Sequence, residues 1–313
     1  MIFGARRLLT SVVLLWLVTL VIFICSSLIP GDVAEAIAGP SASTSDIEHL
    51  RRQLGLDQNV LTRYGSWLWA LMHGDLGASF VDRTSVAHAI AERIAPTASL
   101  AVGTLLIGIV LGVSLGLVAA IREGSWVDHA VRGFAAIAVS IPNYWLGIVL
   151  VAIFSVSLGW LPVTGYVSPS NGLGEWLSHL ILPCLALSWL VAADLARHTR
   201  SSMINILRKP YMRTAEMKRL PRRTVLMKHA LPNAAPPILA TLSLHVIHAL
   251  GGAVFIEIVF GIYGLGELSV HAVLNRDTPT IQGIALLMAV IVVVINLATD
   301  VALALISPRA SSL

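Results

Sequence analysis

Six long apolar stretches constrain this chain more than any other feature of its sequence. They cover residues 8–29, 97–121, 133–158, 177–196, 238–260 and 281–306. A helix that crosses the hydrocarbon core of a bilayer needs about 20 mostly apolar residues, because every backbone N–H and C=O group must find its partner within the segment. The sequence therefore predicts an all-α polytopic membrane protein with about six transmembrane helices.

The overall composition agrees with a membrane location. Hydrophobic residues make up 56% of the 313 residues, charged residues only 12%, and the mean hydropathy is +0.82. A soluble domain carries about twice that charged fraction, and a disordered chain has fewer apolar residues. The two cysteines, Cys25 and Cys184, lie inside apolar stretches, so the sequence offers neither a disulfide framework nor the ligand spacing of a zinc site.

The distribution of Lys and Arg predicts the orientation. With the N-terminus inside, 15 of the 21 basic residues fall on the cytoplasmic side, as the positive-inside rule requires. We expect both termini in the cytoplasm. The first apolar stretch follows Arg6 and Arg7 and runs too long for a signal peptide, so residues 1–29 are interpreted as a retained transmembrane helix. The pI near 9.4 then reflects orientation, and no nucleic-acid partner is expected.

Residues 30–96 form the first long connection, on the extracytoplasmic side. The run from Ser45 to Glu48 can cap a helix, and Leu61, Tyr64 and Leu68 follow an amphipathic helical pattern. The Trp67 and Trp69 pair is typical of a membrane interface. We therefore expect a small amphipathic segment before a core of five transmembrane helices in residues 97–313.

The second long connection, residues 197–233, is cytoplasmic and strongly basic. It holds ten Lys or Arg residues against the single acid Glu216. On charge alone, this composition is as typical of an ordinary loop that follows the positive-inside rule as it is of a segment that binds a cytoplasmic partner. Its length and its three prolines, Pro210, Pro221 and Pro232, favour two or three short helices that pack against a cytoplasmic partner.

Several short motifs, in order along the chain, resemble those of the dipeptide, oligopeptide and nickel permease family of bacterial ABC importers. Each motif is weak alone, but all lie in register with the six predicted spans. They are Pro30-Gly31-Asp32, Leu54-Gly55-Leu56-Asp57, Gly74-Asp75-Leu76-Gly77 with Ser79, Ser140-Ile141-Pro142-Asn143-Tyr144-Trp145-Leu146-Gly147, Gly159-Trp160-Leu161-Pro162, Glu257-Ile258-Val259-Phe260, Gly264-Leu265-Gly266, Arg276-Asp277 and Gln282-Gly283.

The cytoplasmic connection carries the family's most informative motif, the segment that couples a permease to its ATPase. In the peptide branch this segment resembles R-T-A-x-A-K-G-L. The corresponding residues are Arg213, Thr214, Ala215, Glu216, Met217, Lys218, Arg219 and Leu220, and Leu231-Pro232 stands where the family has its final L-P. The departure is Arg219, which replaces a glycine that permits a turn between two short helices.

The resemblance implies a type I ABC importer permease in the bacterial inner membrane. The chain contains no G-x4-G-K-[ST] phosphate loop, so it is expected to bind no cofactor, and ATP and Mg are expected on two partner ATPase subunits. The other implied partners are a second homologous permease subunit, an extracytoplasmic substrate-binding protein and membrane lipid. Di- or oligopeptides are the expected cargo, with nickel or another small solute as the alternative, moved by alternating access.

Ionisable residues inside the apolar stretches are candidates for the substrate path or its gate, because they are costly in lipid. Asp194 lies three residues before Arg197, which favours an ion pair on one helix face. His245 and His248 are also three apart. We interpret them as polar groups that line the path or bond between helices rather than as metal ligands. Glu257 either lines the outer gate or makes a hydrogen bond at its helix end.

Small residues and one enzyme-like motif complete the sequence evidence. Glycines at residues 103, 108, 112 and 116 recur at spacings that favour close helix packing, and Pro142 with Gly147 predicts a kink in the third stretch. The G-x-S-x pattern at Ser79 raises the alternative of an intramembrane serine protease. Ser79 lies outside the apolar stretches, where such a nucleophile could not face a membrane histidine, so that alternative is remote.

Overall fold

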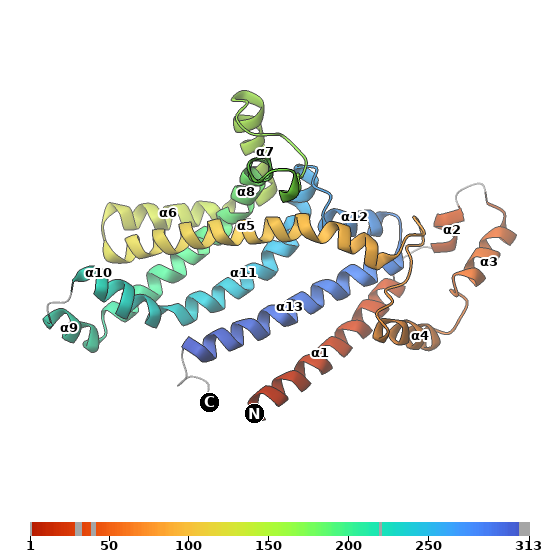
Figure 1. Ribbon diagram of the computed structural model, residues 1–313, viewed down its shortest axis with the longest axis horizontal. Coiled ribbons are helices and arrows are strands. Elements are labelled where there is room, and N and C mark those ends of the chain that lie inside the picture. Colours follow the sequence, from red (N-terminus) through yellow and green to blue (C-terminus); the bar gives the residue numbers. More distant parts are fainter. Residues whose placement is uncertain (1, 29–32, 39–41, 219–220, 307–313) are drawn as a thin grey trace. The chain divides into compact units, whose positions relative to one another are not determined.

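The computed structural model describes residues 2–28, 33–38, 42–218 and 221–306, and these are helical almost throughout. Among them, the only extended pairing is the isolated antiparallel bridge between Ala78 and Ser85. The helices are α1 (Ile2–Ser27), α2 (Val33–Ala38), α3 (Thr44–Gln53), α4 (Val60–Met72), α5 (Val86–Ile121), α6 (Trp126–Ser140), α7 (Asn143–Leu150), α8 (Leu173–Leu207), α9 (Pro210–Met217), α10 (Arg222–Thr224), α11 (Leu231–Val259), α12 (Leu265–Leu274) and α13 (Thr278–Ile306) (Figure 1). Two π-helical segments, Val151–Ser157 and Val225–Ala230, and a short 3-10 helix, Pro169–Asn171, lie between them.

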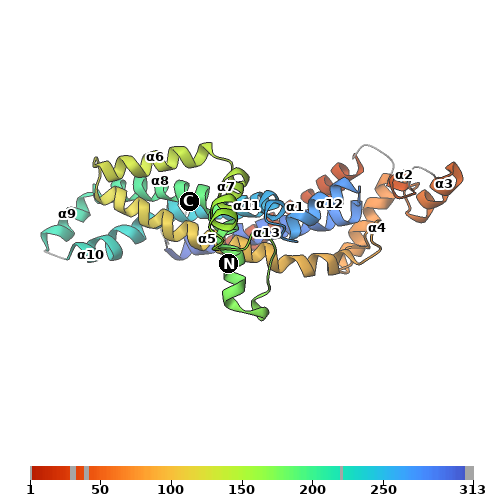
Figure 2. The same ribbon diagram turned by 90° about the horizontal axis from the view of Figure 1, so that it is seen from above.

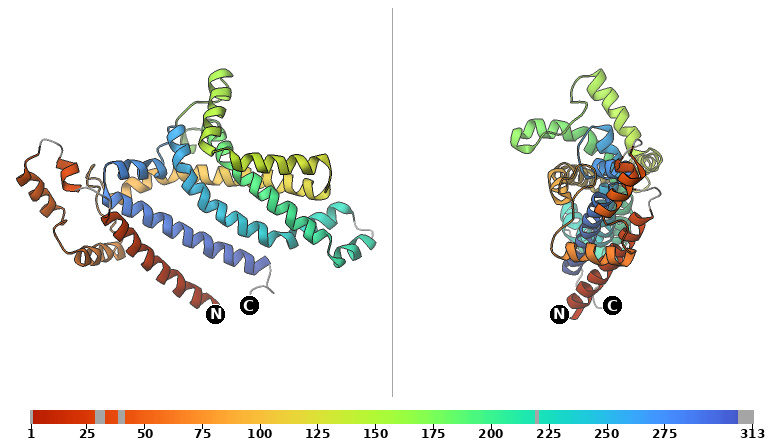
Figure 3. Two further views of the ribbon diagram at one scale, coloured as in Figure 1. Left: turned by 180° about the vertical axis from the view of Figure 1, so that it is seen from behind. Right: turned by 90° about the vertical axis from the view of Figure 1, so that its right-hand side faces the viewer.

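The number of spans agrees with the sequence prediction. In the described part of the chain, five helices are long and apolar enough to cross a membrane, and a bent pair of helices makes up to six. The third predicted stretch is that pair. It is one apolar run in the sequence, but the helix from Trp126 to Ser140 and the one from Asn143 to Ser157 meet at 101° (Figure 3).

Pro142 explains the sharpness of this bend. Proline has no N–H to donate and its ring clashes with the preceding turn, and it also forces the residue before it out of the helical region. Ile141 accordingly has extended backbone angles, φ −99° and ψ 119°, and Pro142 is the N-cap residue of α7. Gly147 does not bend the chain; it is buried in α7 at the contact with Ile256 and Phe260.

The chain divides into two compact units, and the first comprises Met1–Ala95 and Glu267–Val294. Helix α4 packs on α1 through aromatic rings, with Phe23 5.3 Å from Tyr64 and 5.9 Å from Trp67 between centroids. Figure 2 shows α2, α3 and α4 following α1 along this unit. Gln282 of α13 donates a hydrogen bond to Ser26 of α1 at 2.7 Å, so the Gln282-Gly283 motif serves packing within this unit.

The second unit comprises Pro96–Gly266 and Ile295–Leu313, and α8 is its central helix. Helix α5 lies against α8 along its glycines. A Cβ atom added at Gly108 would meet the Val191 side chain at 2.6 Å, and one at Gly116 would meet Thr199 Cβ at 2.6 Å. These distances are too short for any larger residue, so the predicted role of the glycines in close packing is confirmed.

Several helix ends differ from the sequence expectation. Helix α5 begins at Val86, well before the apolar stretch that starts at residue 97, and α8 continues as one helix to Leu207, so the first part of the expected cytoplasmic loop is helical. The cap of α3 is Ser43, not Ser45: Ser43 and Asp46 bond each other's backbone N–H groups. The bonds from Ser43 hold the pKa of the Asp46 carboxyl below its ordinary value.

Candidate functional site

The predicted coupling segment lies between α8 and α11 and is built from short helices. Pro210 begins α9, as its fixed φ and missing N–H favour at a first helical position, and Pro221 caps α10. Pro232 does not break a helix, contrary to its expected role. It lies in the first turn of α11, which runs on directly from the π-helical segment Val225–Ala230, so the helix continues through it.

A buried anchor holds this segment on the second unit. Met212 of α9 is 1% exposed and Val225 is 4% exposed, and both join a cluster with Met203 and Ile206 of α8 and Ile238 of α11. The segment thus exposes Thr214, Met217 and Lys218, while Met212 and Val225 fix it to both flanking helices.

Part of the predicted coupling motif cannot be placed. Arg219 and Leu220 lie outside the described residues, and so do the side chains of Arg213, Ala215 and Glu216. The described helix α9 ends at Met217, two residues before the position at which the resemblance expects a glycine turn.

Asp194 and His245 join the two helices that flank the coupling segment. His245 of α11 is 6% exposed, and its Nε2 donates to Asp194 Oδ2 of α8 at 2.9 Å. The other Asp194 oxygen accepts from Arg197, the partner predicted from the helical spacing, and His198 lies 3.8 Å from it. The Nδ1 atom of His245 has no hydrogen-bond partner among the described residues. The carboxylate is thus shared between an interhelical bond and a bond within α8.

The two histidines of α11 lie differently. Their ring centroids are 6.3 Å apart, but His248 is exposed while His245 is buried. The described residues contain no group of three His, Cys, Asp or Glu side chains placed to hold a metal ion. The arrangement fits the interhelical hydrogen bond expected for His245 and leaves His248 on the surface of this chain.

Glu257 lies at the end of α11 in a fully buried position. Its carboxylate Oε1 accepts from Thr97 Oγ1 at 2.6 Å, and Thr97 in turn accepts from the Leu265 N–H at 2.8 Å. Gly264 and Gly266 approach so closely that an added Cβ would touch the carboxylate. Glu257 thus holds the turn between α11 and α12 on the start of the second-unit part of α5. Among the open alternatives for this residue, the geometry favours the hydrogen bond at a helix end.

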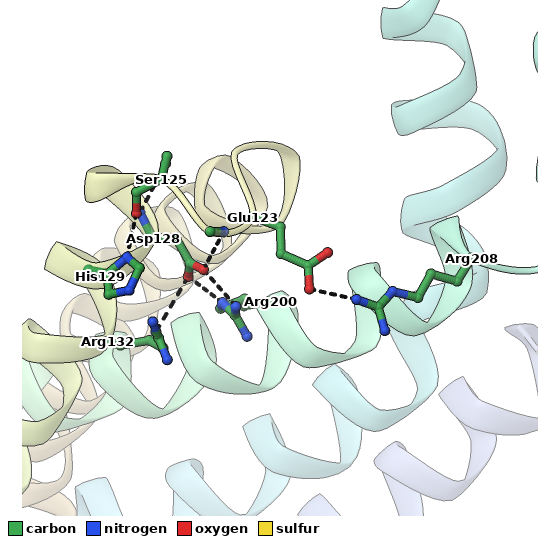
Figure 4. A network of polar contacts seen from close by, with 8 residues as sticks. Glu123, Ser125, Asp128, His129, Arg132, Arg200 and Arg208 are labelled. Carbon is green, nitrogen blue, oxygen red and sulfur yellow. Dashed lines mark hydrogen bonds and ion pairs between the residues drawn. The ribbon is translucent and has the colours of Figure 1, made fainter.

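A second buried carboxylate, Asp128 of α6, was not found by sequence reasoning (Figure 4). It is 1% exposed and bonds Arg200 of α8 through both oxygens, with Arg200 Nη2 2.7 Å from Oδ2. The Gly124 N–H donates to it at 3.0 Å, and Arg132 Nε lies 3.8 Å away. One signal could have found it: Ser125 and Asp128 have the spacing of a helix cap, within a short turn.

Beside this network, Glu123 accepts a hydrogen bond from Arg208 at 2.8 Å (Figure 4). Asp128 and Glu123 therefore attach the turn between α5 and α6 to α8 at two points, and the second lies beside the end of α8 that leads into the coupling segment.

Ser79, the residue behind the protease alternative, makes a structural bond in the first unit. Its hydroxyl donates to Asp277 Oδ2 at 2.6 Å, and Asp277 also accepts from the Phe80 N–H and from Thr280. No histidine bonds Ser79 in the described part of the chain, and its carboxylate partner holds the loop before α5 against the start of α13. Two motifs 198 residues apart in the sequence are thus hydrogen-bond partners.

The sequence matches two family descriptions that together cover most of the chain. Residues 112–312 match the binding-protein-dependent transport system inner membrane component, and residues 1–101 match the N-terminal part of binding-protein-dependent transport system membrane components.

Relatives align over nearly the full length. A probable peptide ABC transporter permease protein of Sinorhizobium fredii is 39% identical over 304 residues, which is 97% of each chain. A putative peptide transport system permease protein of Brucella abortus is 41% identical over 305 residues, and the glutathione transport system permease protein of Escherichia coli K12 is 39% identical over 303 residues; each alignment covers 97% of this chain and at least 96% of the relative.

The fold is also found in a solved transporter. The inward-facing MetNI methionine ABC transporter contains a chain that superposes with a TM-score of 0.57 at 17% identity, covering 69% of this chain and 95% of that one. The fold, the apolar helices and the two family matches agree. The chain belongs to the family of binding-protein-dependent transport system inner membrane components, the permease subunits of ABC importers.

Proposed function

We propose that this permease forms half of a translocation path for di- or oligopeptides, which an extracytoplasmic binding protein delivers. The observation that carries the cargo assignment is the set of relatives described as peptide and glutathione permeases, which align over 97% of the chain at 39–41% identity. Glutathione is itself a tripeptide, so these descriptions share one chemical class. One chain encloses only half of a path, and a second, homologous permease subunit supplies the other half.

The energy comes from two partner ATPase subunits that bind ATP and Mg. Residues 213–220 form the contact with one of them. The support is the motif resemblance together with the position of α9, which is fixed to α8 and α11 by Met212 but exposes Thr214, Met217 and Lys218. Closure of the ATPases would move α9, and the buried anchor would transmit that movement to both flanking helices. The path would then open toward the binding protein, and hydrolysis would reset it.

Transport by the reconstituted complex tests the cargo. The permease, its partner subunits and the binding protein are reconstituted into proteoliposomes with ATP inside, and uptake of a radiolabelled dipeptide is compared with uptake of labelled nickel. We expect ATP-dependent dipeptide uptake that needs the binding protein. Nickel uptake without dipeptide uptake would overturn the cargo assignment. A parallel reaction with a non-hydrolysable ATP analogue measures the background uptake that does not depend on ATP hydrolysis.

Site-directed crosslinking tests the coupling contact, and the structure supplies a matched pair of positions. Met217→Cys places a thiol on the exposed face of α9, where the native residue is 80% exposed, and Met212→Cys places one on the buried face. Both are made in a Cys25→Ser, Cys184→Ala background. We expect Met217→Cys to crosslink to the ATPase and Met212→Cys not to. Failure of Met217→Cys in an assembled complex would refute the contact.

A further inference from the structure

Helices α6 and α8 enclose a groove of about 600 Å3 within the second unit. Its lining has an apolar part and a charged part. One part consists of small apolar side chains from α6, among them Ala136 and Val139. The other part contains the carboxylate of Asp194 and three guanidinium groups, those of Arg132, Arg197 and Arg200. A groove with an apolar wall and a basic rim is suited to an amphiphile with a negative head.

The charges of the groove do not balance. Asp194 bonds Arg197, and Asp128, behind the rim, bonds Arg200 through both oxygens. Arg132 reaches only 3.8 Å from an Asp128 oxygen that Arg200 already occupies, and its side chain is 53% exposed. The surplus positive charge therefore lies on Arg132, at the open side of the rim.

The order of these groups along the helices matches a lipid of the cytoplasmic leaflet. The charge distribution places the turn before α6 in the cytoplasm, so Arg132 lies nearer the membrane surface than Ala136 and Val139. On α8 the order is the same, with Arg200 and Arg197 on the cytoplasmic side of Ala193. A phospholipid has this order too, because its phosphate lies at the surface and its acyl chains lie deeper. Basic pockets between cytoplasmic helix ends are typical sites for anionic headgroups.

We propose that this groove binds an anionic phospholipid of the cytoplasmic leaflet, with its phosphate at Arg132 and an acyl chain along Ala136 and Val139. A peptide cargo fits the groove less well. A free peptide also needs an acceptor for its ammonium group, but both Asp194 oxygens are already engaged, by Arg197 and by His245. The bound lipid would keep α6 and α8 together at the end next to the coupling segment.

Lipid retention by the intact transport complex tests the headgroup contact. The delipidated complex is titrated with dioleoyl phosphatidylglycerol or dioleoyl phosphatidylcholine, and bound copies are counted by native mass spectrometry. The native complex should retain phosphatidylglycerol preferentially. Arg132→Gln should weaken that retention by about fivefold, the effect expected for one basic residue near an anionic headgroup. Arg122→Gln removes the same charge from an exposed cytoplasmic position outside the groove and should have no such effect.

A second pair of variants tests the acyl-chain wall without changing charge. Ala136→Phe fills the groove and should abolish the preferential retention, whereas Ile137→Phe, at an exposed neighbouring position outside the lining, should leave it unchanged. Equal losses for Arg132→Gln and Arg122→Gln would refute the site. So would an Arg132→Gln variant that retains lipid normally but loses cargo uptake, because the groove would then belong to the cargo path. The lipid measurement itself needs no cargo, so it stands apart from the proposed function.

Discussion

Helix α8 makes two very different contacts within the second unit. The α5–α8 seam, formed by Gly103, Gly108, Gly112 and Gly116, brings the helices so close that even one methyl group does not fit. The α8–α11 seam contains the buried His245 and the half-buried Asp194, whose hydrogen bond joins the helices through two polar side chains beside a buried apolar cluster.

The two seams differ in how they hold their helices together. Close packing of backbone against backbone has one arrangement, because any sliding brings atoms into overlap. A hydrogen bond between side chains can be broken and remade with other partners, and Asp194 already has Arg197 as a second partner. We therefore expect α5–α8 to be the more rigid of the two seams, although a buried apolar cluster with Met203 and Ile238 also packs α8 on α11. The coupling segment lies between these two helices.

The largest expected effect comes from filling the α5–α8 seam. A Cβ atom at Gly112 would lie 2.6 Å from Leu195 Cβ and 2.7 Å from the Ala192 carbonyl oxygen, so Gly112→Leu cannot be accommodated by side-chain movement alone. We expect a loss of more than about 3 kcal/mol of stability and no intact complex. Size-exclusion profiles of detergent extracts measure this directly.

Gly133→Leu is the matched control, because Gly133 lies on α6 with open space around its Cβ position. This variant should assemble normally. If both variants assembled alike, the seam would not be the rigid contact that the comparison requires.

Removal of Asp128 should have the next largest effect. This carboxylate ties α6 to α8 and is the buried partner of Arg200, so Asp128→Ala leaves a partly buried guanidinium without its counter-charge. We expect a loss of about 3 kcal/mol, read as a lower melting temperature of the purified complex. Glu123→Ala breaks the neighbouring pair with Arg208, in which both side chains are exposed, and should cost under about 1 kcal/mol. A larger loss for Glu123→Ala would contradict the burial argument.

The sequence predicted that the glycines of α5 pack closely on another helix, but not that this helix is α8, and it predicted only half of the α8–α11 seam. Glycine spacing and the Asp194–Arg197 pair are local patterns, since a helix brings residues three or four apart onto one face. The partners of Asp194 and Asp128 on other helices are 51 and 72 residues away, and no local pattern encodes which helix faces which. His245 was found as a candidate, but its bond to Asp194 needed the fold.

The bend at Pro142 shows a different limit. Proline in an apolar stretch predicts a kink, yet whether the two halves continue across the membrane or turn through 101° depends on what each half packs against. Helix α7 packs on α8 and α11 near Ile256 and Phe260, contacts that come from distant parts of the chain. The positions of the motifs were therefore predictable, but their contacts were not.

A double-mutant cycle measures the α8–α11 bond. His245→Ala and Asp194→Ala each remove one partner of the bond. We expect the sum of their two losses of stability to exceed the loss in the double variant by about 1 kcal/mol, because the bond can be lost only once. If α11 moves relative to α8, His245→Ala should also lower the cargo moved per ATP hydrolysed. His248→Gln, an exposed neighbour one turn along, should change neither quantity. Additive losses would mean that the bond does not hold the seam.

The smallest expected effect tests whether the α5–α8 seam depends on polar groups at all. Thr199 of α8 is fully buried beside Gly116, and its hydroxyl has no hydrogen-bond partner among the described residues. Thr199→Val keeps the shape of the side chain and removes its hydroxyl. The variant should therefore be as stable as the native protein or more stable, by up to about 1 kcal/mol, and its melting temperature should stay the same or rise. Thr97→Val is the same chemical change at a hydroxyl that donates to Glu257 and accepts from Leu265, and it should cost about 1–3 kcal/mol. A loss at Thr199 as large as the loss at Thr97 would show that the seam relies on a polar contact, and the contrast with the α8–α11 seam would fail.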